Sequence, residues 1–484
     1  MDVHHPTPTE RLAQLIDRNQ AALAWAIASM LLLALHYSHG YTGHHFDSAQ
    51  YWGLASFETL GNVPSSRGYV FPALLAPLRS VSSLADNPVH IYRLGMSILY
   101  GGLLTTLLPA AFRQAFGGSL SLARRLVPVL LLAILFPGLL LFPLSDLPAA
   151  LLAFAALLCA LRGMDATASR NQFIGLLVAA GALMGAAYNT RTIYLFAGIP
   201  LGLLAAVTVR GAWARAPYPR WLGLLAFVAG IVAISLPQFA INMRTHGATS
   251  FAVQSAIHSK SLFATQLVWG MTLQRYETTL SRDTPGPQVY YFDPAGARLF
   301  KETAAGGDLF SLPYYMKVVA QHPLEFIALY TRHVVNGLDV RDGLVYTLKP
   351  SPLRSRTALF NFLVLALAVA VVASVRRRKT APTGASWRAV PRSWPVPLAL
   401  LLLPVVAIVP GAIETRFFLP LHLLAYCVIA FHFDAAALRA CVKQHATVMV
   451  LILAVTGALF FAVSLSTMAQ IQYAWPAQYG LGAR

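Results

Sequence analysis

A few acidic and arginine side chains stand beside the apolar runs of this 484-residue sequence, and their types suit chemistry on a phosphate-linked substrate. Asp47 lies in the segment 44–52 (HHFDSAQYW), just after the first apolar run. Asp146, Arg191, Glu414 and Arg416 lie at the ends of later runs. A carboxylate can take a proton from an attacking hydroxyl, and an arginine can bind phosphate through paired N–H groups. We therefore predict Asp47, Asp146 and Glu414 as catalytic residues, and Arg191, Arg416 and, more weakly, Arg67 as ligands of a donor phosphate.

Each of these residues also has a purely structural explanation. Asp47 could be a solvated loop carboxylate or cap a short helix, and Asp146 could cap the helix that follows it. Glu414 and Arg416 could form a structural ion pair, and Arg191 could extend to the membrane interface as an anchor. The sequence leaves these alternatives open.

Aromatic side chains accompany Asp47 in the same loop. Tyr51, Trp52 and Tyr69 could stack on a sugar or contact a lipid, but aromatic residues are also enriched at membrane interfaces for structural reasons. We predict them as sugar or lipid contacts.

No cofactor follows with certainty from the sequence. A divalent metal is possible at His44, His45 and Asp47, although adjacent side chains do not converge easily on one ion. The three cysteines offer no CxxC metal site and no external disulfide, because they fall in apolar runs or near the basic side of the protein.

The elements that must position these residues are transmembrane helices. Hydrophobic residues make up 57% of the chain and charged residues 11%, with a mean hydropathy of +0.60. The apolar runs are continuous rather than alternating, which favours helices over barrel strands. We predict an all-α integral membrane protein with about eleven spans: 21–38, 91–112, 126–142, 147–161, 173–188, 192–209, 221–241, 357–375, 394–411, 417–433 and 446–466.

The distribution of Lys and Arg predicts the orientation of the chain. Of the 36 basic residues, 18 fall in the N-terminal segment and alternate loops, six in the short segments on the opposite side, and twelve in one long loop. The positive-inside rule places the N-terminus in the cytoplasm and Asp47, Asp146, Arg191 and the 414–416 segment outside. Acids and arginines at one membrane depth indicate a site for an anionic, partly lipidic substrate. The net charge of +18 requires no nucleic acid, because cytoplasmic anchoring explains most of it.

We divide the chain into three regions: an N-terminal membrane module (1–241) whose outer loop 40–90 carries Asp47, an extracytoplasmic loop domain of mixed structure (242–356), and C-terminal membrane helices (357–484). Residues 48–60 read as a short interfacial helix. Turn residues cluster at 284–287 and 293–297. After Pro323, the apolar residues Phe326, Ile327, Tyr330, Val334 and Leu338 recur at helical spacing and predict an amphipathic helix.

The order of these motifs resembles the GT-C superfamily of integral membrane glycosyltransferases, which use polyprenyl-phosphate-linked sugars. Asp47-x-x-x-Tyr51-x-x-x-Ala55 is similar to the acidic motif after the first span of protein O-mannosyltransferases and lipid A aminoarabinose transferases. Ser145-Asp146, Arg191 and Glu414-x-Arg416-Phe417-x-x-Pro420 also resemble family positions. The sequence departs from many relatives at Ser48, where they carry a second acidic residue.

The resemblance implies that Asp47 is the acid–base residue of an enzyme that moves a sugar from a polyprenyl-phosphate donor to an extracytoplasmic glycolipid, glycan or protein. The residues fit an inverting transfer, in which the arginines stabilise the departing phosphate and Asp146 and Glu414 orient them or contact the sugar. We expect the chain in the bacterial inner membrane, surrounded by lipid. Two alternatives remain: an O-antigen ligase or polymerase that uses Arg332 and His333, and a lipid or sugar transporter.

Overall fold

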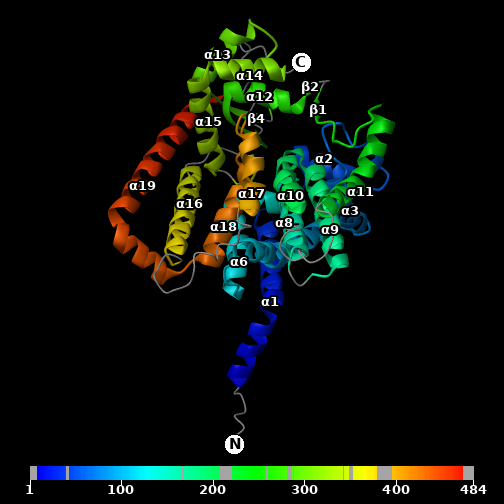
Figure 1. Cartoon of the computed structure of the whole chain (residues 1–484), viewed down its shortest axis with the longest axis vertical. Coiled ribbons are helices and arrows are strands. Elements are labelled where there is room, and N and C mark those ends of the chain that lie inside the picture. The colour runs from blue at the N-terminus through cyan, green and yellow to red at the C-terminus, as the bar shows by residue number, and fades with distance from the viewer. Residues whose placement is uncertain are drawn as a thin grey trace, which may run out of the picture.

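The computed structural model describes residues 8–39, 43–165, 168–207, 221–257, 260–280, 286, 288–341, 343–347, 353–378 and 395–472. Helices dominate these residues, and most of them form one bundle (Figure 1). Most of the predicted basic loops at 208–220 and 379–394, with Arg210, Arg215, Arg220, Lys379, Arg388 and Arg392, lie outside the described residues, as does most of the turn predicted at 284–287.

Eight helical segments of the described chain are long and apolar enough to cross a membrane, judged by length and composition. They are Asn19–Ser38, Pro88–Phe116, Asp146–Gly163, Arg170–Thr190, Trp221–Thr245, Arg354–Val375, Thr415–His432 and Met449–Met468. They belong to α1 (Pro8–Ser38), α4 (Pro88–Gly102) continued by η2 (Leu103–Leu107) and α5 (Leu108–Phe116), α8 (Asp146–Gly163), α9 (Arg170–Thr190), α11 (Trp221–Thr245), α16 (Leu353–Arg378), η6 (Thr415–Phe418) with α18 (Leu419–His432), and α19 (Ala435–Ala469). The prediction of a helical membrane protein is confirmed at this level.

Three of the eleven predicted spans correspond to shorter helices. The run 126–142 is divided between α6 (Leu122–Leu135) and α7 (Pro137–Leu141), with a break at Phe136 (φ −134°). Phe136 precedes a proline, and the proline ring disfavours helical geometry at the residue before it. Of the other two runs, α10 (Leu195–Val207) has 13 residues and α17 (Pro395–Ile408) has 14. At 1.5 Å per residue each is about 20 Å long, so the count of eleven spans remains a prediction.

Helices α8, α9 and α11 pack side by side, with α9 between the other two. Helix α9 packs against both neighbours, and small residues allow the backbones to approach closely. A Cβ on Gly181 of α9 would lie 1.8 Å from the carbonyl oxygen of Phe227 in α11. Small residues permit such contacts between membrane helices, which have little hydrophobic driving force in lipid.

The segment 43–87, which lies in the loop predicted to be outside, contains more helix than the sequence predicted. Helix α2 covers Phe46–Leu54 instead of 48–60, and a 3-10 turn, η1 (Leu60–Asn62), follows it. Helix α2 ends at Leu54, and the next residue, Ala55, is no longer helical (ψ 45°). Helix α3 (Val70–Ser82) and the short η3 (Thr192–Tyr194) complete the segments that flank the candidate site residues.

The long loop forms a small α/β domain at the end of the bundle opposite the N-terminus (Figure 1). Its helices are α12 (Leu262–Thr272), α13 (Pro294–Ala304), α14 (Leu312–Gln321) and α15 (Pro323–Leu338). A sheet of order β5-β3-β4-β6 joins Tyr346–Thr347, Leu273–Thr279, Gln288–Phe292 and Ile471–Gln472, with β3 antiparallel to β4 and parallel to β5. A two-stranded ribbon, β1 (Ala256–Ile257) and β2 (Lys260–Ser261), precedes α12.

Helix α15 confirms the helix predicted after Pro323, but only part of its apolar face is buried. Phe326 and Leu329 pack in the domain core. Ile327 is 61% exposed and Val334 is also exposed. The domain therefore covers one edge of the predicted apolar stripe rather than all of it.

Candidate functional site

Six charged residues from five separate segments meet beside the loop domain. Asp47 lies in the first turn of α2, Asp146 begins α8, and Arg191 ends α9. Arg67 precedes α3, and Glu414 and Arg416 flank the start of η6. We call these six residues the charge cluster. The sequence predicted all of them as site residues, and the structure brings all of them together.

Arg416 is at the centre of the charge cluster. Its Nη2 lies 3.3 Å from Asp47 Oδ2 and its Nη1 lies 3.6 Å from Asp146 Oδ2, while its Nε donates a short hydrogen bond to Glu414 Oε2. The other arginines each bind one acid from the far side. Arg67 Nη2 is 2.5 Å from Asp47 Oδ1, and Arg191 Nη1 is 2.7 Å from Asp146 Oδ1.

Exposure differs sharply among the three acids. The side chain of Asp146 is 3% exposed and that of Glu414 is 8% exposed, whereas that of Asp47 is 32% exposed. Asp47 is therefore the acid that an incoming molecule can reach. Asp146 and Glu414 lie behind Arg416 and balance its charge.

Burial and neighbouring charges shift the pKa values of Asp47 and Glu414 in opposite directions. Burial favours the neutral acid at both positions. At Asp47, Arg67 and Arg416 outweigh burial and hold its pKa below the usual value of an aspartate. At Glu414, burial outweighs the attraction of Arg416, and the pKa of its carboxyl is raised.

Polar and aromatic side chains fix the arginines in place. Arg67 Nη1 donates to the Tyr51 hydroxyl over 3.0 Å, and that hydroxyl donates to Ser145 Oγ over 3.2 Å. The guanidinium of Arg191 lies 4.6 Å from the centre of the Phe417 ring. By contrast, the Asp146 contacts are ion pairs without hydrogen-bond geometry.

Two of the predicted aromatic contacts lie away from the charge cluster. The Tyr69 hydroxyl donates to the Ile234 carbonyl over 2.7 Å, on α11. The Trp52 ring packs against His44 and Tyr92. The structure gives neither side chain a hydrogen bond or ring contact to the charge cluster among the described residues.

The sequence did not point to two tyrosines of the loop domain that border the charge cluster. Tyr346 is 1% exposed, and its hydroxyl accepts a hydrogen bond from the Ser48 backbone N–H over 3.2 Å. Tyr276 is buried beside Glu414 and Arg416, and burial raises the pKa of its phenol well above the usual value. Only the general richness of the loop in tyrosine hinted at them, because nothing local distinguishes these two from the others.

Backbone strain is concentrated at the contact between Tyr346 and α2. Phe46, directly before Asp47, has a φ of 45°, and Val345 has a φ of 68°. The left-handed region is costly for bulky and branched residues and persists only where the surrounding structure enforces it. The rings of Phe46 and Tyr346 lie 5.7 Å apart. One strained residue, Phe46, therefore makes this aromatic contact, and the other, Val345, directly precedes its partner.

A close backbone contact joins the Arg67 loop to the end of α9. A Cβ on Gly68 would lie 2.0 Å from the Asn189 carbonyl oxygen. The Asn189 side chain also accepts a hydrogen bond from the Val70 N–H over 2.8 Å and donates to Gln238 over 2.9 Å. This contact fixes the position of Arg67 relative to Arg191.

The two histidines considered as metal ligands, His44 and His45, lie directly before α2. His45 is the N-cap of α2, where its backbone N–H donates to Ser48 Oγ over 2.9 Å. Within the described residues, no group of three or more His, Cys, Asp or Glu side chains is arranged to hold a metal ion. The charge cluster pairs its three acids with three arginines instead.

Comparisons of this chain with family models, with curated proteins and with solved structures find no match. The resemblance to the GT-C superfamily therefore rests on the motifs quoted above. The geometry of the charge cluster is an independent observation.

Proposed function

We propose that this chain is a membrane glycosyltransferase that moves a sugar from a polyprenyl-phosphate donor to an acceptor hydroxyl or amine at the face of the membrane that bears the loop domain. The observation that carries the proposal is the position of Asp47, the most exposed acid of the charge cluster, between Arg67 and Arg416. A base next to two phosphate-binding groups is the minimum that such a transfer requires.

The transfer is a single displacement at the anomeric carbon. The acceptor oxygen or nitrogen forms a bond to that carbon as the bond from the carbon to the phosphate oxygen breaks. The departing polyprenyl phosphate keeps the electron pair, and the acceptor proton moves to the Asp47 carboxylate. Attack opposite the leaving group inverts the configuration of the sugar.

The arginines control both the leaving group and the base. Arg67 and Arg416 hold the pKa of Asp47 low in the free protein, so its carboxylate is a weak base. A donor phosphate placed beside the same guanidiniums would share their charge, and the basicity of Asp47 would then rise. The base thus becomes effective only when the donor is bound.

The buried acids keep Arg416 in position when the donor leaves. Asp146 and Glu414 both contact Arg416, and their side chains are less than a tenth exposed. A preorganised guanidinium requires little reorganisation as negative charge develops on the phosphate.

The rival reaction centre in the long loop is less well supported. Arg332 donates to Asp293 over 2.6 Å. Both ring nitrogens of the fully buried His333 face backbone carbonyls, at 2.6 Å from Val409 and 2.9 Å from Leu273. These contacts describe residues that stabilise the domain.

Sugar transfer by purified protein in lipid nanodiscs tests the proposal. A panel of labelled polyprenyl-phosphate sugars would be supplied with outer-surface glycolipids and glycoproteins as acceptors, and mass spectrometry of cells with and without the chain would identify the natural product. Asp47→Asn should abolish transfer while the protein remains folded. Asp86→Asn, an exposed acid of the same outer loop, should retain it. Full transfer by Asp47→Asn would overturn the catalytic assignment.

Arg416→Ala separates donor binding from proton transfer. We expect it to weaken use of the donor most strongly, because it removes the side chain that contacts all three acids of the charge cluster. An unchanged dependence of the rate on donor concentration would contradict the phosphate-binding role.

A further inference from the structure

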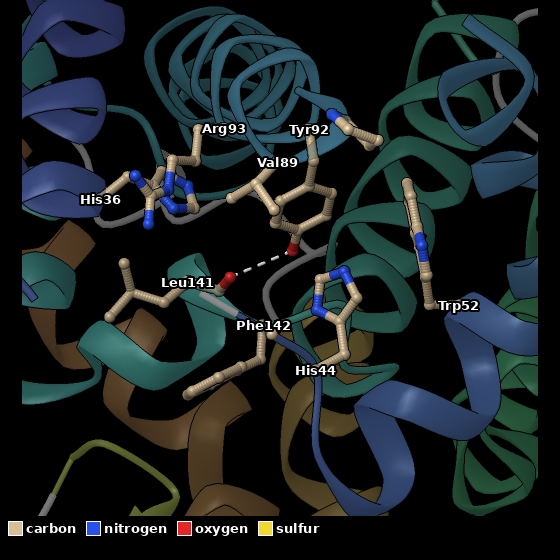
Figure 2. Close-up of a pocket in the computed structure, with 10 residues that line it drawn as sticks. His36, His44, Trp52, Val89, Tyr92, Arg93, Leu141 and Phe142 are labelled. Carbon is tan, nitrogen blue, oxygen red and sulfur yellow. Dashed lines mark hydrogen bonds between the residues drawn. The ribbon is translucent and has the colours of Figure 1, made fainter. Parts of the chain in front are cut away.

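A cavity lies on the Trp52 side of α2 (Figure 2). Its wall is formed by the last turn of α1, the segment before α2, the start of α4 and the end of α7. The lining residues that matter here are His36, His44, Trp52, Tyr92, Arg93 and Phe142. The cavity measures about 100 Å³. An engineered cavity of about 150 Å³ holds a benzene ring, so this space can take part of a ring.

Aromatic rings form one side of this cavity. Trp52 and Tyr92 meet edge to face with centroids 5.2 Å apart, and His44 lies 5.0 Å from Trp52 and 4.8 Å from Tyr92. Figure 2 shows these rings around one space, with Phe142 below them. The Tyr92 hydroxyl is already occupied, since it donates to the Leu141 carbonyl over 3.0 Å. Tyr92 therefore presents its ring, but not a free hydroxyl.

His44 supplies an unused polar group. Its Nδ1 is buried and has no hydrogen-bond partner among the described residues. Buried polar atoms are nearly always paired in folded proteins, so an unpaired one beside a cavity points to a missing partner. Burial, with a smaller effect from His45, lowers the pKa of His44 to about 4. The ring is then neutral at pH 7 and can donate one hydrogen bond and accept another.

The lining of the cavity lacks the several charged donors of a phosphate site. Arg93 is the cationic side chain in the lining, and its guanidinium lies 4.9 Å from the centre of the Tyr37 ring, which is not a lining residue. A neutral histidine offers one donor, whereas phosphate is bound by several charged donors. A purely hydrocarbon occupant would leave His44 Nδ1 unsatisfied.

From the aromatic walls and the unpaired imidazole we infer that this cavity binds one neutral sugar ring, with its apolar face against Trp52 and a hydroxyl on His44. Sugar rings combine an apolar C–H face with hydroxyls that donate and accept hydrogen bonds, which matches this combination of groups. The inference concerns binding alone and goes beyond the proposed transfer.

The cavity and the charge cluster share two structural elements. Successive residues of a helix point about 100° apart, so Tyr51 faces the charge cluster and Trp52 faces the cavity. Phe142 lines the cavity three residues before Ser145, which contacts Tyr51. One unit of a glycan held in the cavity therefore lies next to the reaction centre.

Glycine positions in the same loop allow a bulky side chain to be added at the rim of the cavity without removing any contact. Gly43 lines the cavity, and a Cβ at this position would meet no atom within 4 Å. Gly61 has equally open surroundings but does not line the cavity. Gly43→Phe and Gly61→Phe are thus a matched pair. Trp52→Leu and Trp221→Leu form a second pair, because Trp221 is 57% exposed on α11.

Saturation-transfer NMR with the full-length protein in nanodiscs tests the inference. The probes are neutral methyl glycosides, with inorganic phosphate and a short prenol as comparisons. We expect saturation of the ring protons of at least one glycoside, and binding about tenfold weaker in Gly43→Phe and Trp52→Leu but unchanged in Gly61→Phe and Trp221→Leu. Loss of sugar transfer with retained glycoside binding in Asp47→Asn would show that the two sites act separately.

Two results would overturn the inference. One is the absence of saturation for every glycoside, whether or not phosphate or the prenol binds. The other is equal glycoside binding in the wild type, Gly43→Phe and Trp52→Leu. Because a Cβ on Gly43 meets no atom within 4 Å, we expect Gly43→Phe to keep the thermal unfolding midpoint of the wild type. Measuring that midpoint verifies that the variant is folded.

Discussion

Arg416 Nη2 lies 3.3 Å from Asp47 Oδ2, although the two residues are 369 positions apart in the sequence. The contact joins the first outer loop to the start of α18. It is the link that makes one site out of acids and arginines contributed by both halves of the chain.

Arg416→Lys should abolish sugar transfer even though it keeps the charge. A lysine has a single ammonium on a flexible stem and cannot reproduce the separate contacts of the guanidinium nitrogens with Asp47, Asp146 and Glu414. We expect a rate at least about a hundredfold lower, the size seen when one preorganised electrostatic group is lost. Arg439→Lys, at an exposed position of α19, is the control. A rate within threefold of wild type, about 0.7 kcal/mol, would mean that the fork geometry is unimportant.

Gly68→Ala should impair transfer without changing any charged residue. The new Cβ would lie 2.0 Å from the Asn189 carbonyl oxygen, so the Arg67 loop and the end of α9 must separate. A displacement of about 1 Å at a catalytic group can reduce the rate about a hundredfold. Gly61→Ala, whose Cβ meets nothing within 4 Å, should behave as the wild type. Equal rates for both variants would show that this contact does not position Arg67.

Asp339 lies outside the charge cluster, and Asp339→Ala should lower the free energy of unfolding. Asp339 accepts hydrogen bonds from Arg341 over 2.8 Å and from Ser464 of α19 over 2.5 Å, and both charged residues are buried. Removing the acid leaves the Arg341 charge without its carboxylate, which typically costs about 3–5 kcal/mol. The measurement is the thermal unfolding midpoint in nanodiscs, with the exposed Asp308→Ala as control. An unchanged midpoint for Asp339→Ala would contradict the importance of this pair.

His44 should make stability depend on pH. Its pKa is about 4 in the folded protein and 6.5 for a free histidine, so the unfolded chain binds more protons between these values. The contribution of the neutral ring is therefore complete above about pH 6.5 and declines as the pH falls toward 4. The loss is at most roughly 3 kcal/mol, and less after solvent screening.

His44→Gln should flatten the decline in the unfolding midpoint between pH 6.5 and 4, because glutamine does not titrate. His322→Gln, on the loop domain and partly exposed, is the control for removal of a histidine elsewhere. Parallel slopes for His44→Gln and the wild type would show that His44 is not held neutral by its surroundings.

Local patterns in the sequence were sufficient for the membrane setting and for the choice of charged residues. Continuous apolar runs predict helices wherever they occur, and titratable side chains are scarce enough beside them that Asp47, Asp146, Arg191, Glu414 and Arg416 stood out. Helix α15 followed equally from apolar spacing. These properties depend on neighbours within a few turns, so no tertiary information is required.

Only the tertiary structure decided which of these charges meet and what surrounds them. The pairing of Asp47 with Arg67 and Arg416, the approach of Tyr276 and Tyr346, and the cavity beside His44 all depend on how distant segments pack. The short strands of the loop domain also gave little local signal, whereas the break at Phe136 has a local cause in the proline that follows it. Hydropathy reports how much apolar surface a segment must bury, whereas its partners are fixed by the packing of the whole chain, which no window of sequence contains.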